Sequence, residues 1–187
     1  QEKYLKDVYE ASQRMTALVG SLLNLARLEL GTFSIEPRKT NIEEIAESVL
    51  EELLPQIKRK NIKIEKSYDK KLPAIYTDIK LTRIVFQNLI SNAVKYTRER
   101  GRVNIKISKR SEDKILIQIS DNGYGIPKQE QKKIFTKLYR AVNIRKVDSD
   151  GTGLGLYITK GIIEAYGGKI WFESEEGIGT TFSVIIP

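Results

Sequence analysis

Three clusters of polar and glycine residues in this sequence have types and spacings suited to chemistry. In the first, Asn88, Asn92, Lys95 and Tyr96 follow at intervals of four, three and one, so a helix would place them along one face. An asparagine carbonyl is a hard oxygen ligand for Mg²⁺, and a lysine ammonium is a point charge suited to phosphate. Taken alone, the cluster is better explained as the polar outer face of a helix.

The second cluster is residues 121–127, DNGYGIP, directly after a segment that alternates like a strand and ends near Ser120. A carboxylate such as Asp121 at a strand end can accept a hydrogen bond from an exocyclic amine, for example that of adenine. Gly123 and Gly125 permit close backbone approach and positive φ. An ordinary Asp-Asn-Gly turn explains the cluster equally well.

The third cluster is residues 151–156, GTGLGL, which opens a helix. Glycines let main-chain N–H groups face an anion, and the helix N-terminus adds roughly half a positive charge. This predicts a phosphate cradle. The segment is not a P-loop, because no Gly-Lys-Ser/Thr follows the first glycine at the required spacing. It also lacks the G-x-G-x-x-G spacing and does not follow a strand, which argues against a dinucleotide fold.

Hydrophobic periodicity predicts the elements that must hold these clusters. A stripe from Leu5 to Ala26, at spacings of three and four, predicts one long helix over residues 1–30 that ends at Gly31. Such a helix cannot bury its stripe alone, so we expect it to belong to a dimeric bundle. Beyond Gly31 the expected elements are a strand at 33–36, a helix capped by Asn41 through 59, a strand at 62–64, a helix at 78–96, strands at 103–107 and 115–119, a helix at 154–166, and strands at 170–172 and 182–186.

This order predicts an α+β two-layer sandwich, a mixed sheet with helices on one face, preceded by one long helix. Composition narrows the function. The 187 residues include no Cys and no His, which excludes disulfides, thiolate chemistry, His-bound zinc and Ser-His-Asp catalysis. No run of about 18 apolar residues occurs. The net charge of +8 is spread along the chain, which favours a solvated surface over a nucleic-acid site.

In their order, the three clusters resemble the motifs of the GHKL ATP-binding superfamily, and within it those of sensor histidine kinases. Residues 78–97 resemble the N box of these kinases, residues 134–140 (IFTKLYR) the F box, and residues 177–182 the segment that supports the nucleotide pocket. The resemblance covers the chain. Residues 1–31 are similar to the second helix of the dimerisation and histidine-phosphotransfer hairpin, and residues 32–187 to the catalytic domain with its GHKL fold.

The resemblance implies ATP or ADP with Mg²⁺ as ligands, with Asn92 as the metal ligand and Asn88, Lys95 and Arg140 as catalytic residues. Asp121 would hold the adenine amine, residues 127–150 would form a mobile lid, and residues 151–156 would wrap the phosphates. The residues implied to contact nucleotide are Asn88, Asn92, Lys95, Tyr96, Asp121, Gly123, Gly125, Ile126, Tyr139, Arg140, Gly151, Thr152, Gly153, Leu154, Gly155, Leu156 and Thr181.

Two departures from the superfamily pattern shape the expected activity. Hydrolytic members have a glutamate where this chain has Asn88, and an amide cannot act as a general base, which favours phosphotransfer over hydrolysis. The phosphoacceptor histidine is missing, so we expect a fragment that cannot phosphorylate itself. The alternatives are a GHKL-type ATPase of the chaperone, topoisomerase or mismatch-repair class, an anti-sigma-type serine kinase, and a non-catalytic dimerisation or nucleic-acid-binding module.

The resemblance also implies partners and location. The parent protein would be a homodimer through the N-terminal helix hairpin, and it would pass phosphate to the receiver domain of a response regulator. We expect no nucleic-acid partner. The fragment would be cytoplasmic, and its parent would be anchored in the cell membrane through upstream segments that this sequence does not contain.

Overall fold

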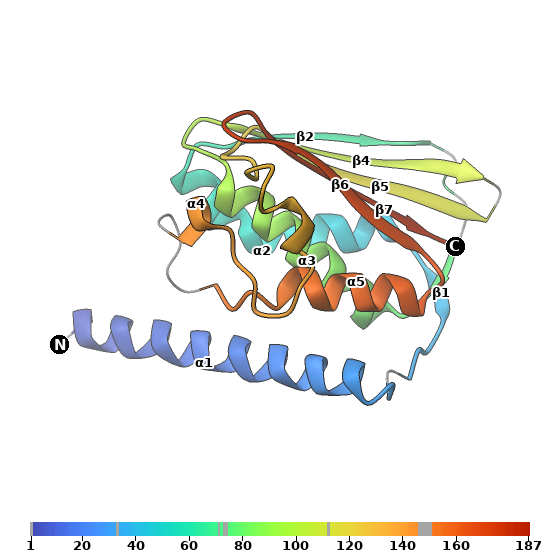
Figure 1. Ribbon diagram of the computed structural model, residues 1–187, viewed down its shortest axis with the longest axis horizontal. Helices are drawn as coiled ribbons and strands as arrows, with labels where there is room; N and C mark the ends of the chain where they lie inside the picture. Colours follow the sequence, from blue (N-terminus) through green and yellow to red (C-terminus); the bar gives the residue numbers. More distant parts are fainter. Residues whose placement is uncertain (1, 33, 71, 73–74, 112, 146–150) are drawn as a thin grey trace.

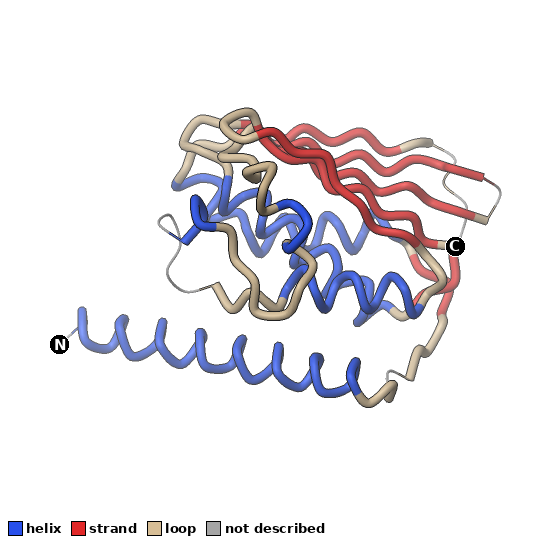
Figure 2. The backbone as a smooth tube through the Cα atoms, in the orientation of Figure 1, coloured by secondary structure: helices blue, strands red, loops and turns tan. Residues whose placement is uncertain are grey.

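The protein is a long helix followed by a two-layer α+β sandwich, as a computed structural model shows (Figures 1 and 2). The structure describes residues 2–187 except 33, 71, 73–74, 112 and 146–150. The sheet forms one layer, the main helices form the second, and the helix α1 (Glu2–Glu29) runs along the outer side of the helical layer (Figure 1). This confirms the predicted fold class, with helices on one face of the sheet.

The main sheet has five strands in the order β2-β4-β5-β7-β6. These are β2 (Lys63–Tyr68), β4 (Arg102–Ser111), β5 (Lys114–Asp121), β6 (Lys169–Glu175) and β7 (Gly179–Ile186). Among the strand pairs of the described residues in this sheet, β2–β4 is parallel and the other three are antiparallel. Alternate residues of the central strands, among them Ile105, Ile107, Ile117 and Ile119, are buried toward the helices. The period-two isoleucine pattern therefore predicted the buried face of the sheet correctly.

Three helices cover that face: α2 (Ile42–Arg59), α3 (Ile79–Tyr96) and α5 (Gly155–Ala165). A short 3-10 helix η1 (Gln131–Lys133) and the four-residue α4 (Val142–Arg145) lie in the segment between β5 and α5. Asn41 caps α2 as predicted, because its side chain accepts a hydrogen bond from the Glu43 N–H at 3.1 Å. The observed helix bounds agree with the predicted ones to within one residue.

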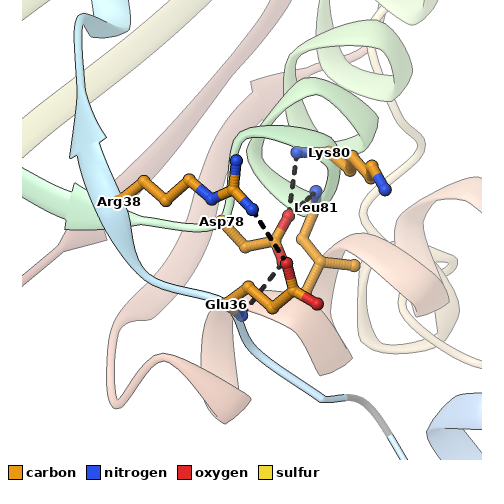
Figure 3. Close-up of polar contacts among 5 residues, drawn as sticks. All are labelled: Glu36, Arg38, Asp78, Lys80 and Leu81. Carbon is orange, nitrogen blue, oxygen red and sulfur yellow. Dashed lines mark hydrogen bonds and ion pairs between the residues drawn. The ribbon is translucent and has the colours of Figure 1, made fainter.

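The start of α3 is fixed by the carboxylate of Asp78 (Figure 3). One oxygen accepts from the main-chain N–H groups of Lys80 at 2.8 Å and Leu81 at 3.1 Å, and the other accepts from the N–H of Glu36 at 3.1 Å. The Tyr166 hydroxyl at the end of α5 donates to the Asp78 carbonyl at 3.1 Å. Asp78 therefore joins the segment before α2 and the last turn of α5 to the helix that carries the first polar cluster.

The prediction of a strand at 33–36 is wrong. The strand is β1 (Arg38–Thr40), and it pairs antiparallel with β3 (Ile75–Thr77), which the sequence analysis did not predict. The Thr40 hydroxyl donates to the Thr77 carbonyl at 3.1 Å, and both threonines are buried. Each strand has three residues and gains its partner only in the folded chain, so local periodicity gives no signal for either. Residue 33 lies outside the described residues.

The helix α1 contacts the rest of the molecule on one face near its C-terminus. Leu25 is buried, the Leu28 side chain packs against Gly161 of α5, and Glu29 pairs with Lys137. Toward its N-terminus the helix is exposed, and its large apolar side chains there include Leu5, Val8, Met15, Leu18, Val19 and Leu22. The predicted apolar stripe is thus left uncovered by the described residues of this chain. No helix among those residues is long and apolar enough to cross a membrane.

Candidate nucleotide site

A cavity of about 360 Å³ lies between α3, α5, the end of β5 and the segment that joins β5 to α5. It brings together all three clusters singled out in the sequence. Its lining includes Asn88, Asn92, Lys95, Tyr96, Asp121, Gly125, Ile126, Tyr139, Arg140, Gly151, Thr152, Gly153, Gly155 and Leu156. Three predicted site residues, Gly123, Leu154 and Thr181, do not line it, and each has another place in the fold.

The helix α3 places the polar face of the first cluster on the cavity. Asn88, Asn92, Lys95 and Tyr96 all line it, as helical spacing predicted. The Asn88 side-chain nitrogen donates to the Gly155 carbonyl and to the Thr159 hydroxyl, both at 3.1 Å. These bonds orient the amide and join α3 to the first turn of α5. Asn88 is therefore held at the wall where the first and third clusters meet.

Asp121 ends β5 at the floor of the cavity. Its carboxylate accepts the Gly123 N–H at 2.9 Å and a main-chain N–H from Thr180. Burial raises the pKa of the Asp121 carboxyl to about 6, even though both N–H donors oppose the rise. Near neutral pH the group is an ionised acceptor in a partly apolar pocket, an arrangement that suits an amine hydrogen of a ligand.

The two glycines of the second cluster allow close packing. A Cβ on Gly123 would lie 2.1 Å from the Tyr96 carbonyl oxygen, and the neighbouring Tyr124 N–H donates to that oxygen at 3.2 Å. Gly125 has φ +63, and a Cβ there would lie 1.9 Å from the Glu175 carbonyl oxygen. Gly123 therefore shapes the site through the backbone contact with α3 and does not line it.

The third cluster lies at the N-terminus of α5. Gly151, Thr152, Gly153 and Gly155 line the cavity, and Gly153 has φ +69, which glycine adopts without strain. Leu154 differs from the prediction, because its side chain is buried in the hydrophobic core. The pattern thus alternates glycines that line the cavity with a leucine that anchors the loop.

The segment between β5 and α5 closes one side of the cavity. Tyr139 and Arg140 line it as predicted, together with Ile134, Ala141 and Ile144. Phe135 anchors this segment to the sheet by edge contacts with Phe172 and Phe182, with ring centres 5.8 and 6.5 Å apart. Residues 146–150 of the predicted lid lie outside the described residues.

The threonine at the floor of the cavity is Thr180, not Thr181. Thr180 pairs with Asp121 across β5 and β7 and so shares its face of the sheet. Thr181 points to the opposite face, where its hydroxyl donates to Ser120 at 2.9 Å. Successive residues of a strand alternate between faces, so a one-residue error in register moves the side chain off the site.

Several lining residues were not predicted, namely Ser91, Ala93, Ile134, Ala141, Ile144, Thr180 and Phe182. Strand alternation could have predicted two of them, Thr180 and Phe182. Once Asp121 is paired with Thr180, alternation also assigns Phe182 to the same face. The apolar residues at 134, 141 and 144 lie in irregular chain with no period that would indicate their direction.

Comparison with known proteins gives the class. The family described as histidine kinase-, DNA gyrase B-, and HSP90-like ATPase matches residues 77–187, which hold all three clusters. The circadian input-output histidine kinase CikA of Synechococcus elongatus (strain ATCC 33912 / PCC 7942 / FACHB-805) is 32% identical over 189 residues, which is 100% of this chain and 25% of CikA. The chain spans less than half the length of CikA and of other curated relatives, SasA and WalK.

Solved structures agree. Full-length ShkA in complex with AMPPNP has a TM-score of 0.84 at 28% identity, covering 100% of this chain and 38% of ShkA. The catalytic domain of the histidine kinase ThkA has a TM-score of 0.70 at 30% identity, covering 81% of this chain and 95% of that domain. This chain belongs to the histidine kinase-, DNA gyrase B- and HSP90-like ATPase family, and within it to the catalytic parts of sensor histidine kinases. The predicted resemblance is confirmed.

Proposed function

We propose that this chain binds Mg²⁺-ATP in the cavity and transfers the γ-phosphoryl group to a histidine that lies outside this sequence. The observation that carries the proposal is the convergence, on one cavity, of a buried carboxylate acceptor, an amide-bearing helix face and a glycine loop at a helix N-terminus. ShkA, solved with the ATP analogue AMPPNP, has the same fold over the whole chain. The carboxylate suits the base of a nucleotide, the amide-bearing helix face suits its magnesium ion, and the glycine loop suits its phosphates.

The base would lie over Asp121, whose carboxylate accepts the 6-amino hydrogen of adenine. Gly125, Ile126 and Thr180 line this end of the cavity beside it. The phosphates would lie against the N-terminus of α5, where the glycines from Gly151 onward expose main-chain N–H groups to an anion. Lys95, Tyr96, Tyr139 and Arg140 would reach the ribose and phosphates from the two sides.

The donor set on α3 fits magnesium. Among the described residues, no group of three His, Cys, Asp or Glu side chains could hold a metal ion by itself. Mg²⁺ in kinases keeps several waters and uses few protein ligands together with substrate phosphates, so a single amide oxygen from Asn92 beside a phosphate site is sufficient. The ion supplies charge neutralisation of the phosphates when bound. Asn88 would support the same region through its bonds to α5.

Phosphoryl transfer requires positioning and charge stabilisation more than covalent chemistry by the protein. Lys95 and Arg140 provide two cations on the cavity wall, and Asn88 provides an oriented amide in the position where hydrolytic relatives have a glutamate base. Because an amide does not take a proton from water, the site favours transfer to a bound nucleophile over hydrolysis. This disfavours the GHKL-type ATPase alternative.

The proposal extends to organisation and partners. Residues 1–31 would be the second helix of a dimerisation hairpin and residues 32–187 the catalytic domain. The acceptor histidine would lie on the first helix of that hairpin, since this sequence contains no histidine. The parent would be a homodimer that phosphorylates the receiver domain of a response regulator. It would be anchored in the cell membrane, with this part in the cytoplasm.

The test is transfer in trans. The chain is mixed with radiolabelled Mg²⁺-ATP and a separate peptide of the first hairpin helix of its parent, with the histidine present or replaced by alanine. We expect acid-labile label on the histidine peptide only, and loss of that label in Asn92→Ala and Lys95→Met. Rapid ATP turnover without label on the peptide would contradict the proposal and favour a hydrolase.

A further inference from the structure

One side chain outside the cavity, Lys60, is bonded to the end of α3 that carries Lys95 and Tyr96. Its ammonium donates to three main-chain carbonyls, those of Val94 at 3.1 Å, Lys95 at 2.6 Å and Thr97 at 2.7 Å. An ammonium has three hydrogens, so these bonds use all of them. Lys60 does not line the cavity and was not among the predicted site residues.

The position of Lys60 follows from the packing of two helices that run in the same direction. Arg83 of α3 bonds Ser48 and Glu52 of α2, and three turns further along the pair, Lys60 at the end of α2 reaches residues 94–97 at the end of α3. The C-termini of both helices therefore lie side by side. Each carries unsatisfied carbonyls and a partial negative charge, so a cation between them is favourable.

The main chain at Lys60 is fixed as well. Lys60 is the C-cap of α2, and Asn61 after it has φ 51. The N–H of Asn61 donates to the Lys58 carbonyl at 3.1 Å, and that of Ile62 donates to the Ile57 carbonyl at 3.0 Å. These are the two bonds of a Schellman motif. The lysine therefore starts from a rigid point, and its ammonium reaches α3 from a constant direction.

Burial of the charged Lys60 ammonium costs free energy, and the hydrogen bonds to the three carbonyls offset that cost. Burial lowers the pKa of the Lys60 ammonium, with a smaller contribution in the same direction from Arg59. A lysine with no role in the fold would keep its ammonium in water. The bonds to α3 are therefore a specific feature of this junction.

The Tyr96 carbonyl accepts its hydrogen bond from a donor other than Lys60. The Tyr124 N–H donates to it at 3.2 Å from the segment that holds Asp121. Lys60 therefore bonds the turn that carries Lys95, whereas a different contact joins α3 to the segment near Asp121. Loss of Lys60 would release the carbonyls at 94, 95 and 97 but leave this contact in place. The side chain most affected in the cavity is then Lys95, which the proposed function assigns to phosphate.

We propose that Lys60 is a positioning residue for the nucleotide: its ammonium fixes the last turn of α3 and so holds Lys95 in the direction of the phosphates. This inference rests on the proposed function, since it assigns Lys60 an effect on the same site. Lys60 itself does not line the cavity.

The test is a double-mutant cycle on the whole chain. Affinities for Mg²⁺-ATP and for adenosine are measured by calorimetry in wild type, Lys60→Met, Lys95→Met and the double variant. Loss of a partner behind a metal ligand typically costs about tenfold or more in affinity, and we expect a loss on the same scale for Lys60. We expect Lys60→Met to weaken ATP about tenfold and adenosine less than about twofold, and to have little further effect on ATP once Lys95 is replaced.

Controls separate positioning from stability. Arg83→Met removes the contacts of Arg83 with Ser48 and Glu52 of α2, far from the C-terminal turn, and should leave both affinities unchanged. Lys60→Arg keeps the charge but replaces the compact ammonium with a planar guanidinium, so it should restore part of the ATP affinity. If Lys60→Met does not fold, Lys60→Gln replaces it in the same cycle with the same expected outcomes.

The inference would be overturned by wild-type ATP affinity in the Lys60 variant, or by additive losses from Lys60 and Lys95. Equal losses for ATP and adenosine would also overturn it, because they indicate a general disturbance of the cavity. Failure of the proposed function is distinguishable, since the wild-type chain itself would then not bind Mg²⁺-ATP.

Discussion

At the scale of single residues, the proposed function assigns the choice of base to Asp121. Its carboxylate is partly buried, is held by the N–H groups of Gly123 and Thr180, and has a pKa raised by burial to about 6. The ordinary value is 3.8, so the ionised form is disfavoured in the folded chain. A hydrogen-bond donor on a ligand would stabilise the ionised carboxylate and offset the free energy that its burial costs.

Asp121→Asn should weaken adenosine binding and narrow the preference for adenosine over guanosine. The variant presents an amide where the base presents its amine, and a buried mismatch of this kind costs about 1–3 kcal/mol. Guanosine has a carbonyl at the corresponding position and should lose less. Competition calorimetry with both nucleosides measures the ratio. Equal losses for both would assign Asp121 a structural role only.

Acid should weaken adenosine binding as the pH falls through about 6, because protonation removes the acceptor. Adenosine is the suitable ligand, since phosphate groups titrate in the same range.

The stability of the folded chain should depend on pH in the opposite direction. With the folded pKa above the unfolded one, this carboxyl contributes stability below pH 4 that is lost as the pH rises through 6. Asp121→Asn should therefore gain in unfolding free energy relative to wild type over pH 4–7, and its adenosine affinity should not change with pH. A wild-type affinity that stays constant from pH 7 to pH 5 would contradict the assignment.

At the scale of elements, the site depends on how α3 begins and ends. Asp78 fixes the start by accepting three main-chain N–H groups, whereas the equivalent cap of α2, Asn41, accepts one. Tyr166 adds a bond from the end of α5. The cap therefore orients α3 against both α5 and the segment before α2.

Asp78→Ala should destabilise the chain by about 2 kcal/mol, the upper end of the range for N-caps, because a linker contact is lost together with the cap. Asn41→Ala is the matched control and should cost about 1 kcal/mol. Urea unfolding of both variants gives the comparison. Equal losses would show that the bond from Glu36 contributes nothing.

Most elements were predictable from the sequence because their signals are local. The cap at Asn41 and the alternating isoleucines of β4 and β5 mark their elements directly. The pairing of β1 with β3 could not be predicted, since each strand is short and its partner is distant in the chain. The register of β7 against β5 also depends on a distant partner, so Thr181 was predicted at the site where Thr180 lies. The position of Lys60 depends on two helix ends meeting in the folded chain, so no local sequence pattern indicates its contact with α3.

At the scale of the whole molecule, α1 is packed at its C-terminal end and exposed over the rest of its length. Leu25 and Leu28 pack toward α5, whereas the apolar stripe N-terminal to them is uncovered, with 53% of the Leu22 surface exposed. Burial of one leucine is worth about 1.5–3 kcal/mol, so a continuous exposed stripe favours association.

We expect the chain to self-associate through this stripe. Leu22→Glu should shift the sedimentation coefficient toward that of a monomer at the same concentration, because a charge in an apolar interface is costly. ATP affinity should not change, since the cavity lies in residues 88–182. A wild-type chain that stays monomeric up to high micromolar concentration, with α1 ordered, would contradict the packing argument.

In the proposed function these residues form a magnesium-dependent ATP site, and titration calorimetry of ATP with and without Mg²⁺ is the direct test. We expect binding in both conditions, tighter with the metal, and loss of the metal effect in Asn92→Ala because the amide oxygen on α3 is removed. ADP and guanosine nucleotides serve as comparison ligands. Absence of ATP binding, or equal affinity with and without Mg²⁺ in the wild-type chain, would contradict the account.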